Sequence, residues 1–205
     1  MMALSAGLAL FFGSHVATGF LPIRRAMTAL FGEKAYKGLF TLVSLAGFAL
    51  IIYGGQRAGF AHLYLPPGFG AWVPALTMPL ACILLIGAYS DPGIKAVVRH
   101  PFLWAVLIFA ASHLFANGEQ VTTLVFGSFL VYAPLAMLLA DRKAAARDAG
   151  AFQAFKARTS HIPFAAWARA PSKPKWRTVI GGVVLYAVIF WTHALVIGAS
   201  AAAGL

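Results

Sequence analysis

The chain has 205 residues, of which 61% are hydrophobic and only 10% are charged, and its mean hydropathy is +0.82. A soluble domain of this size is excluded, because so few polar groups could not cover its surface. A single cysteine excludes an internal disulfide framework, and the net charge of +11 does not indicate nucleic acid, because the basic residues fall in the gaps between apolar runs.

The predicted elements, in chain order, are six apolar runs that are each long enough as a helix to cross a bilayer. They cover about 2–20, 37–54, 72–90, 101–117, 120–140 and 178–199. The fourth run has roughly 17 residues, so we expect its helix to stand nearly upright in the membrane. Since no polar stretch could form a second core, the sequence predicts one all-α domain over 1–205, a polytopic membrane protein with a bundle of six transmembrane helices.

The orientation of the bundle follows from its basic residues. All of the 16 Lys and Arg residues except Arg57 lie in or at the edges of the segments 21–36, 91–100 and 141–177. Because Lys and Arg are enriched in cytoplasmic loops, these three segments are predicted to be cytoplasmic loops and both termini are predicted to lie outside.

The third of these loops contains a different kind of predicted helix. Residues 149–170 place aromatic side chains among basic ones, in the sequence AGAFQAFKARTSHIPFAAWARA. This mixture is typical of helices that lie in the headgroup region of a membrane. We therefore expect an amphipathic interfacial helix through about Arg158, between the fifth and sixth spans. His161 follows it, and we expect that residue to be solvated in the loop.

Three histidines lie inside apolar runs: His15 in the first, His113 in the fourth and His193 in the sixth. An imidazole in a membrane can be satisfied by a hydrogen bond to a neighbouring helix. An intramembrane ionisable residue is also a functional candidate by default. His100 stands just before Pro101, and proline suits the first turn of a helix, so we expect His100 to act at the entry of the fourth helix.

The acidic residues limit what the histidines could bind, because all five Asp and Glu residues fall in loops or at the ends of spans. Zinc catalysis usually needs three protein ligands and an outer carboxylate, and proton pumping needs carboxylates inside the membrane. Two imidazoles from different helices, in an apolar bundle rich in Gly and Phe, instead suit a b-type haem.

Two histidine pairs are candidates for such a haem. Counting along the helices puts His15 and His113 about 10 Å apart in depth, which predicts a haem roughly parallel to the membrane. The same count puts His113 and His193 at nearly equal depth, which predicts an upright haem.

Three stretches resemble the NnrU family: GEKAYKGLFTLVSLAGFALIIYG (32–54), RHPFLWAVLIFAASHLFANGE (99–119) and FKARTSHIPF (155–164). The pattern R-H-P-x-x-W followed by H-L-x-A-N-G is the most specific part. Members are polytopic membrane proteins associated with denitrification and nitric oxide metabolism, and 15-cis-zeta-carotene isomerase, a haem b enzyme, belongs to the same family. The resemblance implies an integral protein of the bacterial inner membrane, whose termini would then be periplasmic.

Carried over residue by residue, the resemblance makes His15 and His113 the axial ligands of haem b. His193 stays the alternative second ligand because of the depth count. The resemblance makes His100 non-axial. In the isomerase a cysteine shortly before the second histidine is implicated in ligand exchange. The matching residues 108–111 contain no cysteine. This departure speaks against isomerase activity and leaves bis-histidine ligation open.

Three further residues are candidates for contact with the cofactor. Arg99 could meet a haem propionate or a lipid phosphate. Trp104 could form a wall of the pocket or pack in the core. Asn117, followed by Gly118, could hold a ligand at the outer face or end its helix in a left-handed conformation.

These observations give two functional hypotheses. The leading one is an NnrU-type membrane protein that binds haem b, with a redox or isomerase role on a lipophilic small molecule or in nitrogen-oxide metabolism. The other is a haem-free accessory membrane protein of a denitrification system, in which the histidines serve packing alone. In both cases the expected partners include membrane lipids and exclude nucleic acid.

Overall fold

The computed structural model describes residues 1–167, 171–197 and 201, and these residues form helices and no strand. The helices are α1 (Met2–Gly19), α2 (Leu21–Arg57), α3 (Trp72–Ser90), α4 (Ile94–Val97), α5 (Pro101–Ala116), α6 (Gln120–Arg147), α7 (Ala149–Ala157) and α8 (Trp176–Ile197). The all-α prediction is confirmed. Among the described residues, five helices are long and apolar enough to cross a membrane: α1, α2, α3, α6 and α8. Helix α5 is apolar but shorter, with 16 residues.

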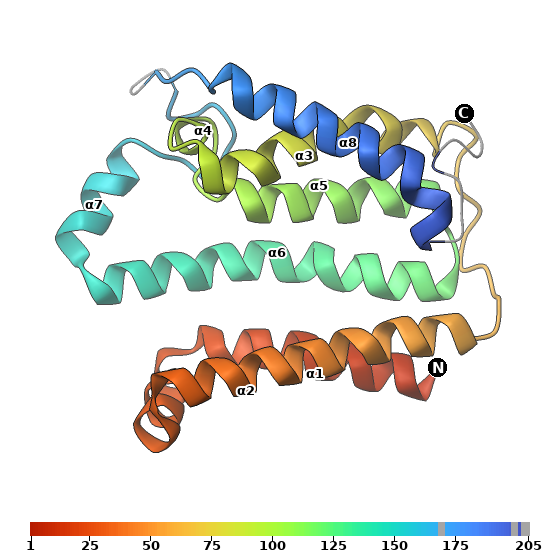
Figure 1. Cartoon of the computed structure of the whole chain (residues 1–205), viewed down its shortest axis with the longest axis horizontal. Coiled ribbons are helices and arrows are strands. Elements are labelled where there is room, and N and C mark those ends of the chain that lie inside the picture. The colour runs from red at the N-terminus through yellow and green to blue at the C-terminus, as the bar shows by residue number, and fades with distance from the viewer. Residues whose placement is uncertain (168–170, 198–200, 202–205) are drawn as a thin grey trace.

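Helix α6 lies between two groups of helices (Figure 1). On one side α1 and α2 form a hairpin, and on the other side α3 packs against both α5 and α8. The ring of Phe129 in α6 lies 6.0 Å from that of Phe11 in α1 and 6.4 Å from that of Phe109 in α5, measured between centroids. An aromatic layer therefore joins the two groups through α6.

Glycines allow α1 and α2 to pack backbone against backbone. A Cβ atom built on Gly54 would lie 2.3 Å from the backbone nitrogen of Leu4, and one on Gly7 would lie 2.6 Å from that of Ile51. Small residues at helix contacts permit such close approach in membrane proteins, where van der Waals packing holds helices together. The hairpin is thus specified by the glycine positions of both helices.

The predicted loop 21–36 is wrong, because these residues are helical. Helix α2 begins at Leu21 and is broken at Gly32, whose φ of 77° and ψ of 158° are outside the helical range. Residues 21–31 therefore form a separate helical segment, which turns away from the rest of α2 at the lower left of Figure 1. A search for long uncharged runs passes over this segment, because Arg24 and Arg25 interrupt its apolar residues.

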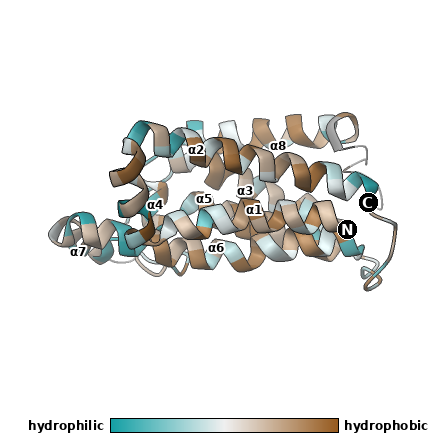
Figure 2. Ribbon diagram, turned by 90° about the horizontal axis from the view of Figure 1, so that it is seen from below, coloured by the Kyte–Doolittle hydropathy of each residue, from teal (hydrophilic) through white to brown (hydrophobic). Residues whose placement is uncertain are grey.

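The long helices expose large apolar side chains along their length. Leu76 of α3, Val131 of α6 and Trp191 of α8 are 73%, 74% and 79% exposed. Figure 2 shows hydrophobic residues along the body of the bundle and many of the hydrophilic ones at its ends. Exposed apolar surface of this extent marks a face that water does not cover. The chain is therefore an integral membrane protein.

Both ends of the bundle agree with the predicted arrangement of loops. Met1 and the end of α8 lie at one end, and α4 and α7 lie at the other (Figure 1). Helix α7 covers nearly the predicted amphipathic segment, and the carboxylate of Asp148 caps it by accepting from the Ala151 amide at 2.9 Å. Helix α6 continues to Arg147, seven residues past the predicted end of the fifth span at residue 140. The orientation in the membrane and the interfacial position of α7 stay predictions.

Candidate functional site

A cavity of about 580 Å³ lies between α3, α5 and α8. Its walls are mostly apolar, and they carry a few polar groups, among them His113, Asn117, Tyr186 and His193. Sites for small ligands and cofactors in proteins have volumes of this order and a similar mixture of apolar walls and few polar groups. The arrangement is suited to a largely apolar ligand.

His113 reaches this cavity from the last turn of α5, and a hydrogen bond fixes its tautomer. Its Nδ1 lies 2.8 Å from the backbone oxygen of Phe109. Because a carbonyl can only accept, Nδ1 carries the proton and Nε2 keeps its lone pair. Within the described part of the chain, Nε2 of His113 has no hydrogen-bond partner. Histidines that bind metals usually have this arrangement, in which the second ring nitrogen donates to a carbonyl or carboxylate.

His15 has the same local arrangement in α1. Its Nδ1 lies 2.7 Å from the backbone oxygen of Phe11, which again leaves Nε2 as the acceptor. Its ring packs against Phe11 at 4.3 Å, Phe40 of α2 at 4.9 Å and Tyr132 of α6 at 5.8 Å between centroids. His15 thus lies among rings from three helices, and it is not one of the residues that line the cavity.

An aromatic stripe on α6 connects the surroundings of the two histidines. Phe126, Phe129 and Tyr132 follow one another at three-residue spacing, which places them on neighbouring parts of one helix face. The ring of Phe126 lies 4.9 Å from His113, and that of Tyr132 lies 5.8 Å from His15. Helices α1 and α5 run in opposite directions along α6 (Figure 1). Because side chains lean toward the N-terminus of their own helix, the two imidazoles lean toward each other from either side of the Phe129 layer.

The structure brings the other candidate pair together in a different way. His113 and His193 both line the cavity, from α5 and α8. The two residues that counting along the helices put at nearly equal depth therefore line the same cavity. Among the described residues, no ring contact joins His15 directly to His113.

Asn117 lies next to His113, at the end of α5. Its side-chain Nδ2 donates to the backbone oxygen of His113 at 2.9 Å, and its backbone N–H donates to the same oxygen at 3.0 Å. The predicted left-handed conformation is wrong, because Asn117 has extended φ and ψ angles of −134° and 119°. The side-chain amide satisfies a carbonyl at the helix end, which removes the need for a left-handed turn.

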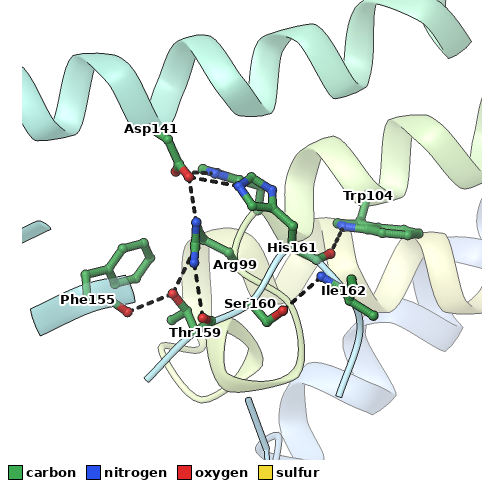
Figure 3. Close-up of polar contacts among 9 residues, drawn as sticks. Arg99, Trp104, Asp141, Phe155, Thr159, Ser160, His161 and Ile162 are labelled. Atoms are coloured by element: carbon green, nitrogen blue, oxygen red, sulfur yellow. Dashed lines mark hydrogen bonds and ion pairs between the residues drawn. The ribbon is translucent and has the colours of Figure 1, made fainter. Parts of the chain in front are cut away.

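The remaining candidates, Arg99 and Trp104, lie at the opposite end of α5. Arg99 belongs to a polar cluster that we call the Asp141 cluster, and the indole of Trp104 donates to the backbone of His161, one of its members. The cluster consists of Arg99, Asp141, Thr159 and His161, which Figure 3 labels, and of His100, which bonds to Asp141. Three donors converge on the Asp141 carboxylate: an Arg99 Nη at 2.6 Å, the Nε2 of His100 at 2.8 Å and the Nε2 of His161 at 2.8 Å.

The rest of the Arg99 guanidinium is also satisfied. Its Nε donates to the Thr159 hydroxyl at 3.0 Å, and its second Nη donates to the Thr159 backbone oxygen at 3.2 Å. The side chains of Arg99 and Asp141 are 7% and 15% exposed, so this ion pair is largely removed from water. A buried pair of this kind is strongly coupled, because either charge alone would be left without compensation.

The two histidines of the cluster share one carboxylate. Burial lowers the pKa of His100 below its usual value; the contact with Asp141 raises it, and the neighbouring His161 and Arg99 lower it further, with a net decrease. His100 is therefore neutral near pH 7 and donates to Asp141 as neutral imidazole. The prediction that His161 is solvated is wrong, because it bonds to Asp141 and is only 35% exposed on its side chain.

A metal is one possible occupant of this cluster, since the ligand atoms of His100, Asp141 and His161 lie within 4.8 Å of one another. The Arg99 guanidinium argues against a cation, because it already neutralises the carboxylate and would face the bound ion at short range. The bonds that the cluster makes to the backbone instead indicate a structural role.

That role is to fasten the segment after α7 to the start of α5. The Arg99 amide donates to the Ser160 oxygen at 2.7 Å, and the Trp104 indole donates to the His161 oxygen at 3.0 Å. The Phe164 amide donates to the Val97 oxygen at 2.7 Å. Trp104 thus holds the segment in place, which is a function that its sequence context did not reveal.

One signal in the sequence could have located the cluster. Arg99 stands at a membrane boundary before an apolar helix, where a buried cation needs an anion. Asp141 directly follows the fifth apolar run and is predicted at the same boundary.

A comparison with known proteins assigns the chain to a family. The family model described as NnrU protein matches residues 3–201. No curated protein and no solved structure gives a match to the chain. The matched region contains every helix from α2 to α8, both candidate histidine pairs and the whole Asp141 cluster. The chain therefore belongs to the NnrU family.

Proposed function

We propose that the protein binds haem b inside its bundle, with His15 and His113 as the axial ligands. The observation that carries the proposal is the shared tautomer of the two imidazoles. Each donates its Nδ1–H to the carbonyl four residues earlier, at 2.7 Å for His15 and 2.8 Å for His113, and each keeps a lone pair on Nε2. A polar atom without a partner in an apolar setting costs free energy, and coordination to iron would remove that cost.

The surroundings of the two imidazoles are aromatic. The rings of Phe11, Phe109 and Phe129 form a layer between them, and these rings would have to move apart to admit a flat macrocycle and pack against its faces. The helices leave both ligands only partly exposed. Bound haem would supply redox chemistry at its iron, and the residues of this chain would bind the iron, fix its orientation and keep the site dry.

Of the other residues predicted to contact the cofactor, only Asn117 has a role in the proposal. Asn117 would position His113, because its amide holds the carbonyl of that residue at 2.9 Å. Arg99 and Trp104 are engaged in the Asp141 cluster and at the segment after α7, so we assign them no contact with haem.

His193 is the alternative partner of His113, and the shared cavity favours it. Under the preferred pairing, the cavity instead takes a lipophilic small molecule beside His113, because its walls are mostly apolar. The protein would then act on that molecule in a redox or isomerase reaction, or serve nitrogen-oxide metabolism. We further propose that α5 is the sixth span, and that α7 lies at the membrane surface.

The ligands can be identified with four alanine variants of the purified protein. Haem content is measured by conversion to the pyridine haemochrome, and folding is checked by circular dichroism and gel filtration. We expect His15→Ala and His113→Ala to lose the haem, and His193→Ala and the control His62→Ala to retain it. His62 is a matched control, because it is exposed in a loop between α2 and α3.

Each other outcome points to a different reading. Loss of haem in His113→Ala and His193→Ala, with retention in His15→Ala, would establish the alternative pair. Absence of haem from folded wild-type protein, made in cells that produce haem, would contradict the proposal and support a haem-free accessory role.

A further inference from the structure

We propose that the protein has a specific site for the phosphate headgroup of an anionic glycerophospholipid, in a pocket between the first segment of α2 and the end of α6. The pocket has a volume of about 520 Å³. None of the described residues that line it is a histidine, and the inference does not depend on haem binding. We call it the basic pocket; the polar residues that line it are Arg24, Arg25, Thr28, Lys143 and Arg147.

The basic pocket carries a surplus of positive charge. Its lining contains two arginines from α2 and a lysine and an arginine from α6, and it contains no Asp or Glu. The nearest compensation comes from Glu33, whose carboxylate lies 4.0 Å from Arg24. Glu33 is itself 62% exposed and lies closer to Lys37, at 2.8 Å, so it offsets little of the charge of the pocket.

The two central cations of the pocket repel each other. Arg24 and Lys143 are both half-buried, and both line the pocket, one from each helix. Neighbouring like charges raise the free energy of a fold unless an anion lies between them. Asp141 and Asp148, the acids nearest in sequence to Lys143, are used elsewhere: Asp141 binds Arg99, and Asp148 caps α7.

The apolar surface beside the pocket indicates that the anion belongs to a lipid. The segment 21–31 exposes Ile23, Leu30 and Phe31 by 46%, 73% and 48% of their surface. A helical segment that carries both basic residues and exposed apolar residues is typical of helices that lie at the boundary between headgroups and acyl chains. A phospholipid would satisfy both surfaces, whereas free phosphate would satisfy only the cations. Basic pockets between transmembrane helices on the cytoplasmic side are known to hold anionic headgroups.

The test uses the full-length protein in detergent and counts retained lipids by native mass spectrometry. Phosphatidylglycerol is titrated in one arm and phosphatidylcholine in a second; inorganic phosphate is added in a third arm, read by thermal shift. We expect phosphatidylglycerol to bind much more tightly than phosphatidylcholine, and phosphate alone to give no stabilisation. The double variant Arg24→Gln/Lys143→Gln should weaken phosphatidylglycerol binding about 25-fold, since each basic residue near an anionic membrane contributes about fivefold.

Two further variants separate the site from general charge. The matched control Arg142→Gln/Arg158→Gln removes two exposed cations outside the pocket and should change binding less than about twofold. Lys143→Glu should raise the melting temperature of lipid-free protein, by pairing with Arg24, and should abolish the stabilisation by phosphatidylglycerol. Equal binding of the two lipids, or unchanged binding in the double variant, would overturn the proposal. Stabilisation by inorganic phosphate equal to that by the lipid would show that a soluble anion is the ligand.

Discussion

Replacing Asp141 by Asn should destabilise the protein more than any other single loss of charge in the described chain. The substitution keeps the shape of the side chain but leaves the Arg99 guanidinium, 7% exposed, without its anion at 2.6 Å. It also weakens the bonds from His100 and His161, both 2.8 Å long. Breaking one partner of a buried ion pair costs about 3–5 kcal/mol.

For a chain of this length, each kcal/mol corresponds to a change of about 2–4 °C in melting temperature. We therefore expect the melting temperature of Asp141→Asn to fall by about 10 °C, measured by circular dichroism in a mild detergent. The control is Glu33→Gln, which removes an exposed carboxylate that pairs with Lys37. Because exposed pairs contribute about 0–1 kcal/mol, this control should change the melting temperature by only a few degrees.

A double variant tests the physical reason for the loss. Arg99→Met combined with Asp141→Leu removes both charges together, so most of the stability should return, because a buried ion pair can often be replaced by apolar residues at little cost. The reasoning is refuted if Asp141→Asn melts within about 2 °C of the wild type. It is also refuted if the losses of stability in Arg99→Met alone and in Asp141→Leu alone add up in the double variant.

Three other predictions concern different parts of the molecule. The melting temperature should fall as the pH drops below about 6.5. Burial lowers the pKa of His100 in the folded chain, so the unfolded chain takes up the proton first and is favoured. The variant His100→Gln should flatten this part of the curve of melting temperature against pH. Gly54→Ala should lower the free energy of unfolding by about 1–3 kcal/mol, because its Cβ would meet the backbone of α1. Gly38→Ala has open space around it and should stabilise its helix slightly. Thermal melting should therefore show changes of opposite sign for the two variants. A cysteine introduced by Ser160→Cys, after Cys82→Ala, should react in intact cells only with a membrane-permeant reagent, and reaction with an impermeant one would reverse the assigned orientation.

Helix bounds were predictable where the sequence carries both an apolar run and a terminal signal. Helix α3 covers 72–90 as predicted, and α5 begins at Pro101, whose ring suits a first helical turn. The segment 21–31 and the short helix α4 were not predicted, because they are too short or too charged to appear as runs. The break at Gly32 was equally hidden, since a glycine can occupy a helix or end it.

The Asp141 cluster could be predicted only in part, for a different reason. Its bonds join residues 41, 42 and 20 positions apart, and hydropathy contains no information about such pairings. The same holds for the cavity. Helices α5 and α8 are apolar nearly all round, so the sequence does not define which face of each turns inward, and the shared exposure of His113 and His193 to one cavity appears only in the fold.

The visible absorption spectrum of the purified full-length protein, recorded before and after reduction with dithionite, tests the central claim most directly. The protein is produced in cells that make haem, and folding is verified by gel filtration. We predict a Soret band that shifts on reduction, together with sharp α and β bands that are absent from His113→Ala and present in His62→Ala. A featureless visible spectrum from folded protein would contradict haem binding.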